Sequence, residues 1–475
     1  MRRFLKWKWL LRLGVLMVLL SVVLPLTIVL IMRNQGKAEV NRIVAQLDAD
    51  DPNWKLDDLA NELNAKLPPP ERNPFTVFQK AHAALPSGWN QLTNAPPNLD
   101  KTPVNCVPSK PVLDDFIKLQ QSTLPALQHA RQLAGMPEGG RVLQFSRNPM
   151  MTFDMAVIQK FRDIAALLRY DAIALASTGR SNEAIQSARA AFGVPRAIGS
   201  DPMMLSQHVR MATDVIAVST VERVLNLGEP NSGLADLQED LLQQSRFPSA
   251  RQSMRGERAF VHRMFEVIDS GEIMNALGGT AGTGFPTTGN SIIVWGLRIN
   301  LPTDHAYSLK VLTQYVESSK LPSEQQLEAV KAIVRAQKND TRYRMTSDLV
   351  PALDKSLEAG FRMKGKLMAA AVGVACERYR QKFGQWPLTL DMIPKDILSE
   401  IPLDPFTGKP IIYNRLPDGI MVYTVGPDLK DDGGILDDPI KKVRGTDFGI
   451  RIYDPALRRL PVPAKPVELA EPGTP

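Results

Sequence analysis

Apolar residues three and four positions apart recur from about Val112 to Lys338, and this spacing is typical of helices with one buried face. Start and stop signals support several segments: Glu183 lies in the first turn after Ser181, and Gly228 follows the segment that ends at Leu227. The pattern therefore predicts a large α-helical domain. Its expected helices cover residues 112–134, 154–178, 181–193, 203–227, 233–244, 255–269, 304–318 and 322–337.

Two stretches of this region have a second interpretation. The Gly/Thr-rich residues 278–290 interrupt the periodicity and predict a mobile loop. Residues 167–192 resemble a single tetratricopeptide-like hairpin with its turn at Gly179. No second copy follows at that family's period of about 34 residues, and its aromatic positions and terminal proline are missing. We therefore interpret the pair as a helical hairpin inside the domain.

An uncharged apolar run extends from Leu13 to Met32. Its length matches the roughly 20 residues that a helix needs to cross a bilayer. Trp7 and Trp9 precede it, where aromatic side chains favour the membrane interface. Five Lys or Arg residues come before the run and three follow it closely, so we expect a cytoplasmic N-terminus and an extracytoplasmic body.

A cleaved signal peptide is the alternative for this run. The run is longer than the apolar core of a signal peptide, and no small-residue cleavage site follows it closely. The RRFLK start resembles a twin-arginine signal only loosely. We predict an uncleaved signal anchor.

The segment after the apolar run has two parts with different sequence patterns. Residues 37–66 are amphipathic and predict helix with a break near Asp51-Pro52. Residues 68–111 contain prolines throughout, beginning with a run of three, and predict an extended, irregular connection.

The C-terminal part predicts a helix followed by a small sheet. Met368, Val372, Ala375 and Tyr379 share one helix face, and the small residues in its centre allow a close partner. Gly384 ends this helix. Residues 411–413 begin a strand, residues 420–425 return after a Pro-Asp-Gly turn, and residues 448–453 supply a last strand.

The motifs in this part are specific. They comprise Asp404-Pro405, Gly408, Pro410, Tyr413, Tyr423, Gly426 and Asp428. In this order, after a helix, they resemble the globular domain of type II secretion major pseudopilins, over roughly 80 residues. The whole chain also resembles membrane-anchored proteins of planctomycete type. The resemblance implies a helix packed on a short antiparallel sheet, with a C-terminal loop that binds calcium.

The N-terminus departs from the pseudopilin pattern. A prepilin peptidase site would have a Gly before an aromatic residue and a Glu in the apolar helix, whereas Val15 follows Gly14 and the run has no Glu. The resemblance therefore supports a prediction of the fold more strongly than a prediction of the function.

The calcium expectation rests on an acidic loop with two glycines. Asp428, Asp437 and Asp438 could supply carboxylate oxygens, which Ca²⁺ prefers, together with backbone carbonyls. The spacing is not that of an EF-hand, and a solvated acidic turn is the alternative. We take these three residues as the candidate metal ligands.

Composition excludes some classes of protein. The net charge is +7, but no basic cluster interleaved with aromatic residues occurs, so we expect no nucleic-acid partner. The two cysteines, Cys106 and Cys376, do not make a disulfide framework, and unpaired thiols are favoured over a bridge.

Catalytic motifs are absent from the sequence. The five histidines form no metal-binding spacing, and there is no nucleophile elbow, phosphate loop or dinucleotide fingerprint. Two helical sets could line a polar cleft: His208 with Arg210 and Asp214, and Glu257-Arg258 with His262. Ion pairs on helix surfaces explain both sets as well. The sequence thus identifies no catalytic residue.

Together these patterns predict a mostly α-helical protein with an N-terminal transmembrane helix, a large helical domain and a small C-terminal α+β domain. The expected divisions are a basic cytoplasmic tip (1–12), an anchor (13–32), a helical stalk with the proline-rich connection (33–111), the helical domain (112–345), the pseudopilin-like domain (346–456) and a disordered tail (457–475).

The expected function is that of a non-enzymatic scaffold or binding protein of the cell envelope with a link to secretion. It would lie in the cytoplasmic membrane with its bulk outside and bind envelope protein partners, in an oligomeric state that the sequence leaves open. A hydrolase with an unrecognised site in the helical domain is the alternative.

Overall fold

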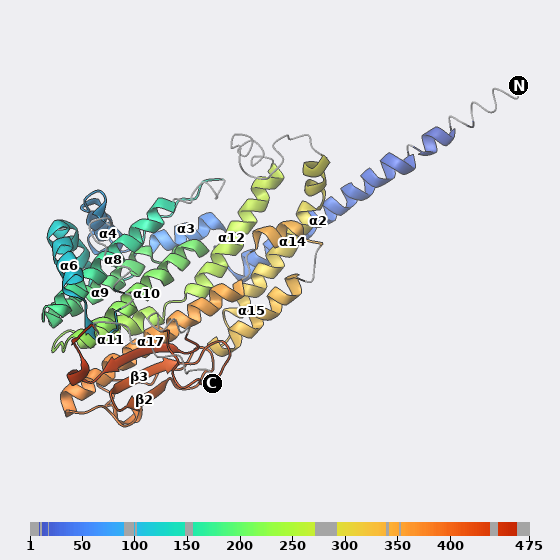
Figure 1. Cartoon of the computed structure of the whole chain (residues 1–475). Helices are drawn as coiled ribbons and strands as arrows, with labels where there is room; N and C mark the ends of the chain where they lie inside the picture. The colour runs from blue at the N-terminus through green and yellow to red at the C-terminus, as the bar shows by residue number, and fades with distance from the viewer. Residues whose placement is uncertain are drawn as a thin grey trace, which may run out of the picture.

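The computed structural model describes residues 9, 12–17, 19–89, 99, 102–147, 155–270, 292–338, 342–350, 353–437 and 445–462. The expected loop over 278–290 and the candidate ligand Asp438 lie outside these residues. The protein is mostly helical, with one N-terminal apolar helix, a large helical domain and a C-terminal sheet of three antiparallel strands, which confirms the predicted fold class (Figure 1).

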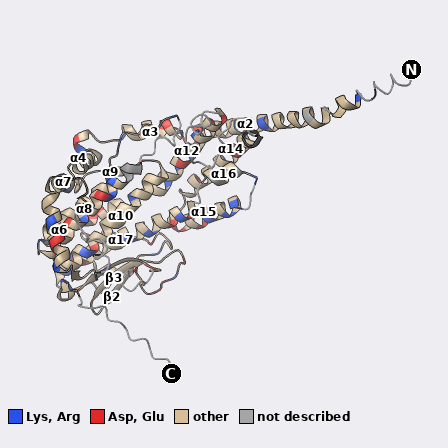
Figure 2. Cartoon of the chain, turned by 45° about the horizontal axis from the view of Figure 1, so that its top comes forward, with Lys and Arg blue, Asp and Glu red and all other residues tan. Residues whose placement is uncertain are grey.

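The N-terminal helix projects from the body as a rod (Figure 1). It continues through a turn of π-helix, η1 (Leu19–Val23), into α2 (Leu24–Asp50). The helix from Arg12 to Asp50 is long and apolar enough to cross a membrane, a property that a signal sequence shares, and its apolar stretch is not buried in the protein. Figure 2 shows hardly any charged residue along the projecting part.

The C-terminal half of α2 is docked on the body. It packs along α14 (Ile292–Ser318), and a Cβ atom on Gly36 would lie 2.9 Å from the backbone nitrogen of Thr303. Arg33 and Lys37 both pair with Asp269, at 2.6 and 3.1 Å. The projecting rod is thereby fixed at its base by close packing and by charge.

The break predicted near Asp51-Pro52 is present. Helix α2 ends at Asp50, and α3 (Leu56–Ala65) follows after a short turn. The indole of Trp54 in that turn is buried and donates to Asp48 at 2.8 Å, so the turn itself belongs to the core.

The predicted helices of the middle region are confirmed, with shifts at several ends. They are α8 (Met155–Ser177), α9 (Ser181–Ile198), α10 (Met204–Leu227), α11 (Leu234–Ser245), α12 (Ser249–Ser270), α14 and α15 (Ser323–Lys338). The hairpin of α8 and α9 turns at Gly179, whose φ of +83° suits glycine. Helix α14 begins well before the expected residue 304 and contains Pro302.

The segment predicted as one helix over 112–134 is divided. It forms α6 (Lys110–Ser122), α7 (Leu124–Ala130) and the 3₁₀ turn η4 (Arg131–Leu133). Pro125 lies in the first turn of α7, a position that proline favours because the missing N–H is not needed there.

The proline-rich connection is more ordered than predicted. A 3₁₀ turn, η2 (Pro70–Arg72), is followed by helix α4 (Pro74–Ala83). Asn73 caps α4 by accepting the N–H of Phe75 at 3.0 Å. The prediction of irregular chain is wrong for these residues, because Asn73 caps a helix whose first residue is Pro74.

The C-terminal region packs one long helix against the sheet. Helix α17 (Leu353–Phe383) begins earlier than residue 361 and lies against β3 (Gly419–Thr424) and β4 (Phe448–Tyr453). Strand β2 (Ile412–Leu416) completes the order β2–β3–β4. A Cβ atom on Gly373 would lie 2.6 Å from Cδ1 of Ile450, so the small centre of the helix allows the close approach that the sequence predicted.

The sheet region and the helical domain share one hydrophobic core. Helix α17 contacts the sheet on one side and α10 and α11 on another. A single cluster of buried side chains runs from α8 and α9 through α17 to Val422 and Ile452 of the sheet. A second cluster joins α12, α14, α15 and the start of α17. The C-terminal sheet region is therefore built into the body.

The chain after β4 turns back to the helical domain. A 3₁₀ turn, η7 (Pro455–Leu457), leads to β5 (Leu460–Pro461), which pairs in parallel with β1 (Cys106–Val107). The predicted disorder from residue 457 is therefore wrong for 457–462, because backbone pairing with β1 and the buried ion pair of Arg458 with Glu377 hold this part. Residues 463–475 lie outside the described chain.

Candidate functional site

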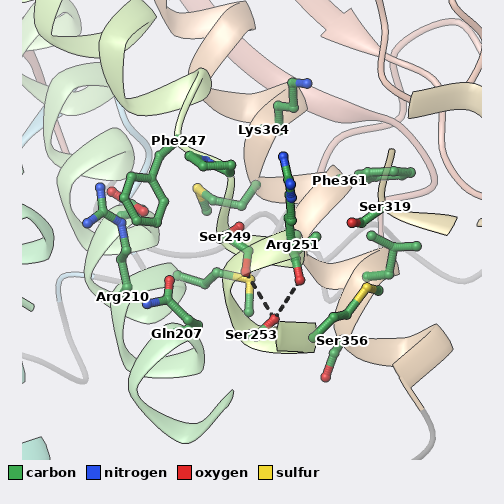
Figure 3. Close-up of a pocket in the computed structure, with 18 of the residues that line it drawn as sticks. Gln207, Arg210, Phe247, Ser249, Arg251, Ser253, Ser319, Ser356, Phe361 and Lys364 are labelled. Carbon is green, nitrogen blue, oxygen red and sulfur yellow. Dashed lines mark hydrogen bonds between the residues drawn. The ribbon is translucent and has the colours of Figure 1, made fainter. Parts of the chain in front are cut away.

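A pocket of about 250 Å³ lies between α10, the start of α12, α15 and α17 (Figure 3). Methionine, leucine and phenylalanine side chains supply its apolar wall, among them Met204, Met254 and Phe361. Serine, glutamine and basic side chains supply the polar part. This mixture of an apolar wall and convergent polar groups is typical of small-molecule sites.

One wall holds Arg210, which is almost fully buried. Its guanidinium donates to both oxygens of Glu138, at 2.7 and 2.9 Å, and its Cζ lies 3.5 Å from the ring centroid of Phe247. The paired charge and the stacked ring hold Arg210 in one orientation.

Beside Arg210, the pocket lining contains polar atoms without partners. Asp214 Oδ1, Gln244 Oε1 and Gln207 Oε1 are buried and accept no hydrogen bond from the described residues. Burial raises the pKa of Asp214 to about 7, although Arg210 opposes the shift. Such unpaired groups are costly in a protein interior, and they concentrate at functional sites.

A second wall brings His208 of α10 to Ser356 of α17. The Nε2 atom of His208 lies 2.7 Å from Oγ of Ser356. Burial lowers the pKa of His208, which favours the neutral imidazole that can act as a base. The pair could activate the serine hydroxyl.

The open side of the pocket carries two basic groups. Figure 3 shows the side chain of Arg251 extending through the middle of the pocket toward Lys364. Lys364 Nζ reaches Ser323 Oγ at 3.4 Å, and burial lowers its pKa. Among the described residues, neither group has a carboxylate within ion-pair distance.

One of the two sets singled out in the sequence therefore lines the pocket. His208, Arg210 and Asp214 all face it from α10. They do not form the expected ion pair along the helix, because Arg210 pairs with Glu138 instead. Arg251, Ser356 and Lys364 escaped the sequence analysis because they lie on other helices and belong to no motif.

The other set is part of the core. Glu257 accepts the N–H of Met204 at 3.2 Å, and Arg258 pairs with Asp51. His262 Nδ1 lies 2.9 Å from His305 Nε2, and the ring of His305 stacks on Phe265. Burial lowers the pKa of His262 to about 3 and that of His305 to about 4. These contacts join α12 and α14 to the base of the N-terminal helix.

The acidic loop uses several of its carboxylates to hold its own backbone. Asp437 accepts the N–H of Gly445 at 2.9 Å and faces Lys366 at 3.5 Å, and Asp428 faces the N–H of Lys430 at 3.4 Å. Asp447 accepts from Gly434 and Ile435, while its buried Oδ1 has no partner among the described residues. Asp438 lies outside the described chain.

The unpartnered carboxylate oxygen of Asp447 is of the chemical type that binds cations. Burial raises the pKa of Asp447, and the neighbouring Asp431 and Asp432 raise it further. Yet the part of the chain that the structure describes brings together no group of three or more His, Cys, Asp or Glu side chains able to hold a metal. Asp447 was missed in the sequence because it follows the loop by several residues.

Three residues of the C-terminal motif have structural roles. Asp404 is buried and accepts the N–H groups of Phe406 and Val425, at 2.7 and 2.9 Å. Tyr423 donates to Asp431 at 2.9 Å, and Tyr413 donates to the carbonyl of Pro387 at 2.6 Å. The motif therefore fixes loops around the sheet.

Both cysteines are buried free thiols, which confirms the favoured interpretation. Burial raises the pKa of each, so both thiols stay protonated and unreactive.

No protein family, curated protein or solved structure was found to match this chain.

Proposed function

We propose that the protein is a membrane-anchored protein of the cell envelope whose extracytoplasmic body binds a partner or ligand. The observation that carries the proposal is the helix from Arg12 to Asp50, which is long and apolar enough to cross a membrane. Its apolar half is exposed, and its other half is docked by Gly36 and the pairs to Asp269. A helix of this kind would hold the body at a fixed orientation to a bilayer.

A topology experiment tests the anchor. We expect the full-length chain to stay in the membrane pellet after alkaline extraction, with an intact N-terminus by mass, and the body to be digested by protease added from outside. A variant with Leu20→Arg and Leu26→Arg should become soluble, because each charge near the bilayer centre costs roughly 2.5–3.5 kcal/mol. Recovery of a wild-type chain that has lost its first residues would instead identify a signal peptide.

We further propose a link to secretion through the C-terminal region. Support comes from the long helix on a small antiparallel sheet and from the loop positions fixed by Asp404 and Tyr423. Cross-linking in membranes followed by purification of the detergent-solubilised chain should recover envelope secretion components. If a chain that lacks residues 1–32 and stays in the cytoplasm recovers the same proteins, this result would contradict the link to secretion.

We also propose that the acidic loop binds calcium through Asp428, Asp437 and Asp438, with the unpartnered oxygen of Asp447 close by in the chain. Chelation should lower the thermal midpoint, and readdition of Ca²⁺ but not Mg²⁺ should restore it, because Ca²⁺ accepts flexible oxygen sites. Asp428→Asn should lose the effect, whereas Asp391→Asn, at an exposed residue of the turn η6 (Leu390–Met392), should keep it. A midpoint indifferent to chelator would rule the site out.

A hydrolase is the second candidate, favoured by the 2.7 Å contact between His208 and Ser356 at the pocket. A fluorophosphonate probe should then label the wild-type chain and fail with Ser356→Ala and with His208→Ala. Ser319→Ala, at another pocket serine, is the matched control. An unlabelled wild-type chain would remove this candidate.

A further inference from the structure

The charges that line the pocket of Figure 3 do not balance. Among its described lining residues, Asp214 is the single acid, whereas Arg210, Arg246, Arg251 and Lys364 are basic. Arg210 is neutralised by Glu138 at 2.7 Å, and Arg246 lies 3.8 Å from Glu400. Arg251 and Lys364 remain, and both line the same pocket. A cation without a carboxylate partner in a partly enclosed pocket attracts an anion.

The surroundings of the two cations favour an anion. Lys364 is half-buried, so part of the water that would stabilise its charge is excluded. Within the described chain, its ammonium group donates a single hydrogen bond, to the hydroxyl of Ser323 at 3.4 Å. Retaining an ammonium group there is costly unless a ligand supplies the counter-charge.

The first turn of α12 contributes further donors. Ser249, Ala250 and Arg251 all line the pocket. The N–H of Ser249 bonds to Phe247 and that of Gln252 to Pro248, and those of Ala250 and Arg251 have no acceptor in the described chain. Free N–H groups and the positive end of the dipole at the start of this 22-residue helix add to the attraction of an anion.

We propose that this pocket binds the phosphate ester of a small organic molecule, with its phosphate between Arg251, Lys364 and the first turn of α12. Two cations and several N–H donors match a dianion with three acceptor oxygens better than a carboxylate. The apolar wall of Met204, Met254 and Phe361 contacts the organic part. A volume of about 250 Å³ limits that part to a few carbon atoms, since drug-sized ligands need roughly 300–1,000 Å³.

This inference does not rest on the membrane anchor, because every lining residue belongs to the body. The unpartnered acceptors Asp214 Oδ1, Gln244 Oε1 and Gln207 Oε1 lie in the same wall. Donor groups on the organic part, such as hydroxyls, would complement them after a small side-chain adjustment.

Calorimetric titration of the detergent-solubilised full-length chain tests the proposal at constant ionic strength. Glycerol 3-phosphate is the probe, and glycerol and sulfate are the controls. We expect saturable binding of the ester, weaker binding of inorganic phosphate and none of glycerol. No saturable binding, or equal binding of sulfate, would overturn the phosphate assignment, and equal binding of inorganic phosphate would overturn the ester.

Variants connect the binding to the two cations. Arg251→Gln and Lys364→Met should each weaken binding about tenfold or more, because each removes a charge-assisted contact. The single changes Arg335→Gln and Lys382→Gln at exposed positions each remove one positive charge as well and should leave the affinity unchanged. Unchanged affinity in Arg251→Gln, an exposed residue whose loss does not threaten folding, would overturn the assignment.

The source of the phosphate is settled by a parallel measurement. Nanodiscs that contain phosphatidic acid are compared with nanodiscs of phosphatidylcholine alone. Binding of glycerol 3-phosphate that phosphatidic acid does not compete supports a soluble ester. If phosphatidic acid competes and the competition is lost in Arg251→Gln, the ligand is a lipid headgroup with the same phosphate chemistry. If the competition persists in this variant, the result contradicts the site.

Discussion

Two buried polar clusters in this protein differ in how completely their hydrogen bonds are made. Around Glu377, both carboxylate oxygens accept from Arg380 and Arg458, and Arg458 also donates to the carbonyls of Gly228 and Tyr453. Around Asp214, three acceptor atoms have no partner within the described chain, and two cations nearby have no carboxylate.

This difference distinguishes a cluster that stabilises the fold from a cluster that can bind a ligand. A fully paired buried ion cluster leaves nothing for a ligand to add, and it joins the elements that contribute to it. A partly paired cluster costs stability unless something else completes it. Burial and charge alone would have placed both clusters in the same class.

The largest expected effect breaks the paired cluster. Glu377→Ala leaves Arg458 buried without its carboxylate, so we expect a loss of about 3–5 kcal/mol in unfolding free energy. Denaturant unfolding of the solubilised chain measures it. Glu229→Ala removes an exposed carboxylate that also pairs with Arg380 and should cost less than about 0.5 kcal/mol. Similar losses in the two variants would contradict the comparison.

The histidine pair His262 and His305 tests a paired cluster that can titrate. Both groups have a lowered pKa in the folded protein, so they gain protons on unfolding. Their contribution is complete above the unfolded pKa of 6.5 and decreases as the pH falls toward 4, by on the order of 3 kcal/mol for each group. Thermal unfolding should show this slope in the wild type and a shallower one in His262→Gln with His305→Gln.

The wild type has to be compared with the double histidine variant because Asp214 and Glu257 make the stability change with pH in the opposite direction. Burial raises the pKa of each to about 7. Equal slopes in the wild type and the double variant would show that the histidine pair carries no charge linkage.

The next effect concerns the unpaired cluster. Asp214 has a raised pKa, so the folded state favours its proton, and its favourable contribution is lost as the pH rises from 3.8 through about 7. Asp214→Asn should therefore stabilise the protein above pH 7 by about 1 kcal/mol, because it removes a buried carboxylate. The gain should shrink in acid. A loss of stability at high pH would indicate that Asp214 belongs to the structural class.

The smallest effect is expected at the open side of the pocket. Arg251→Gln should change the unfolding free energy by less than about 0.5 kcal/mol, since the side chain has no partner to lose in the described chain. The same variant has a large expected effect on ligand affinity. Destabilisation by more than about 1 kcal/mol would remove the distinction between the two clusters.

The sequence predicted the helices and the sheet because their periodicity is local. The face of Met368, Val372 and Ala375 anticipated the helix that packs on the sheet, and the break at Asp51-Pro52 was placed correctly. Helix α4 was missed although Asn73-Pro74 is a good start signal, because the number of prolines outweighed one capping residue.

The pocket could not be predicted in the same way. His208 and Ser356 are 148 positions apart in the chain, and no periodicity relates two helices over that separation. Glu377 and Arg458 are separated by 81 positions, and a single Glu-Arg match means little among many charged residues. By contrast, the acidic loop drew attention because its aspartates are consecutive, although several of them only hold the loop together.

The pairing of β5 with β1 bears on how the chain reaches its final state. Asn105 donates to the carbonyl of Leu457, 352 positions later, and Cys106 is the register partner of Leu460. This contact can form only after nearly all of the chain has left the ribosome, whereas the helical hairpins can form early. Assembly of the body therefore waits for its last strand, and a chain that stops before Pro455 would leave the site of β1 without its neighbour.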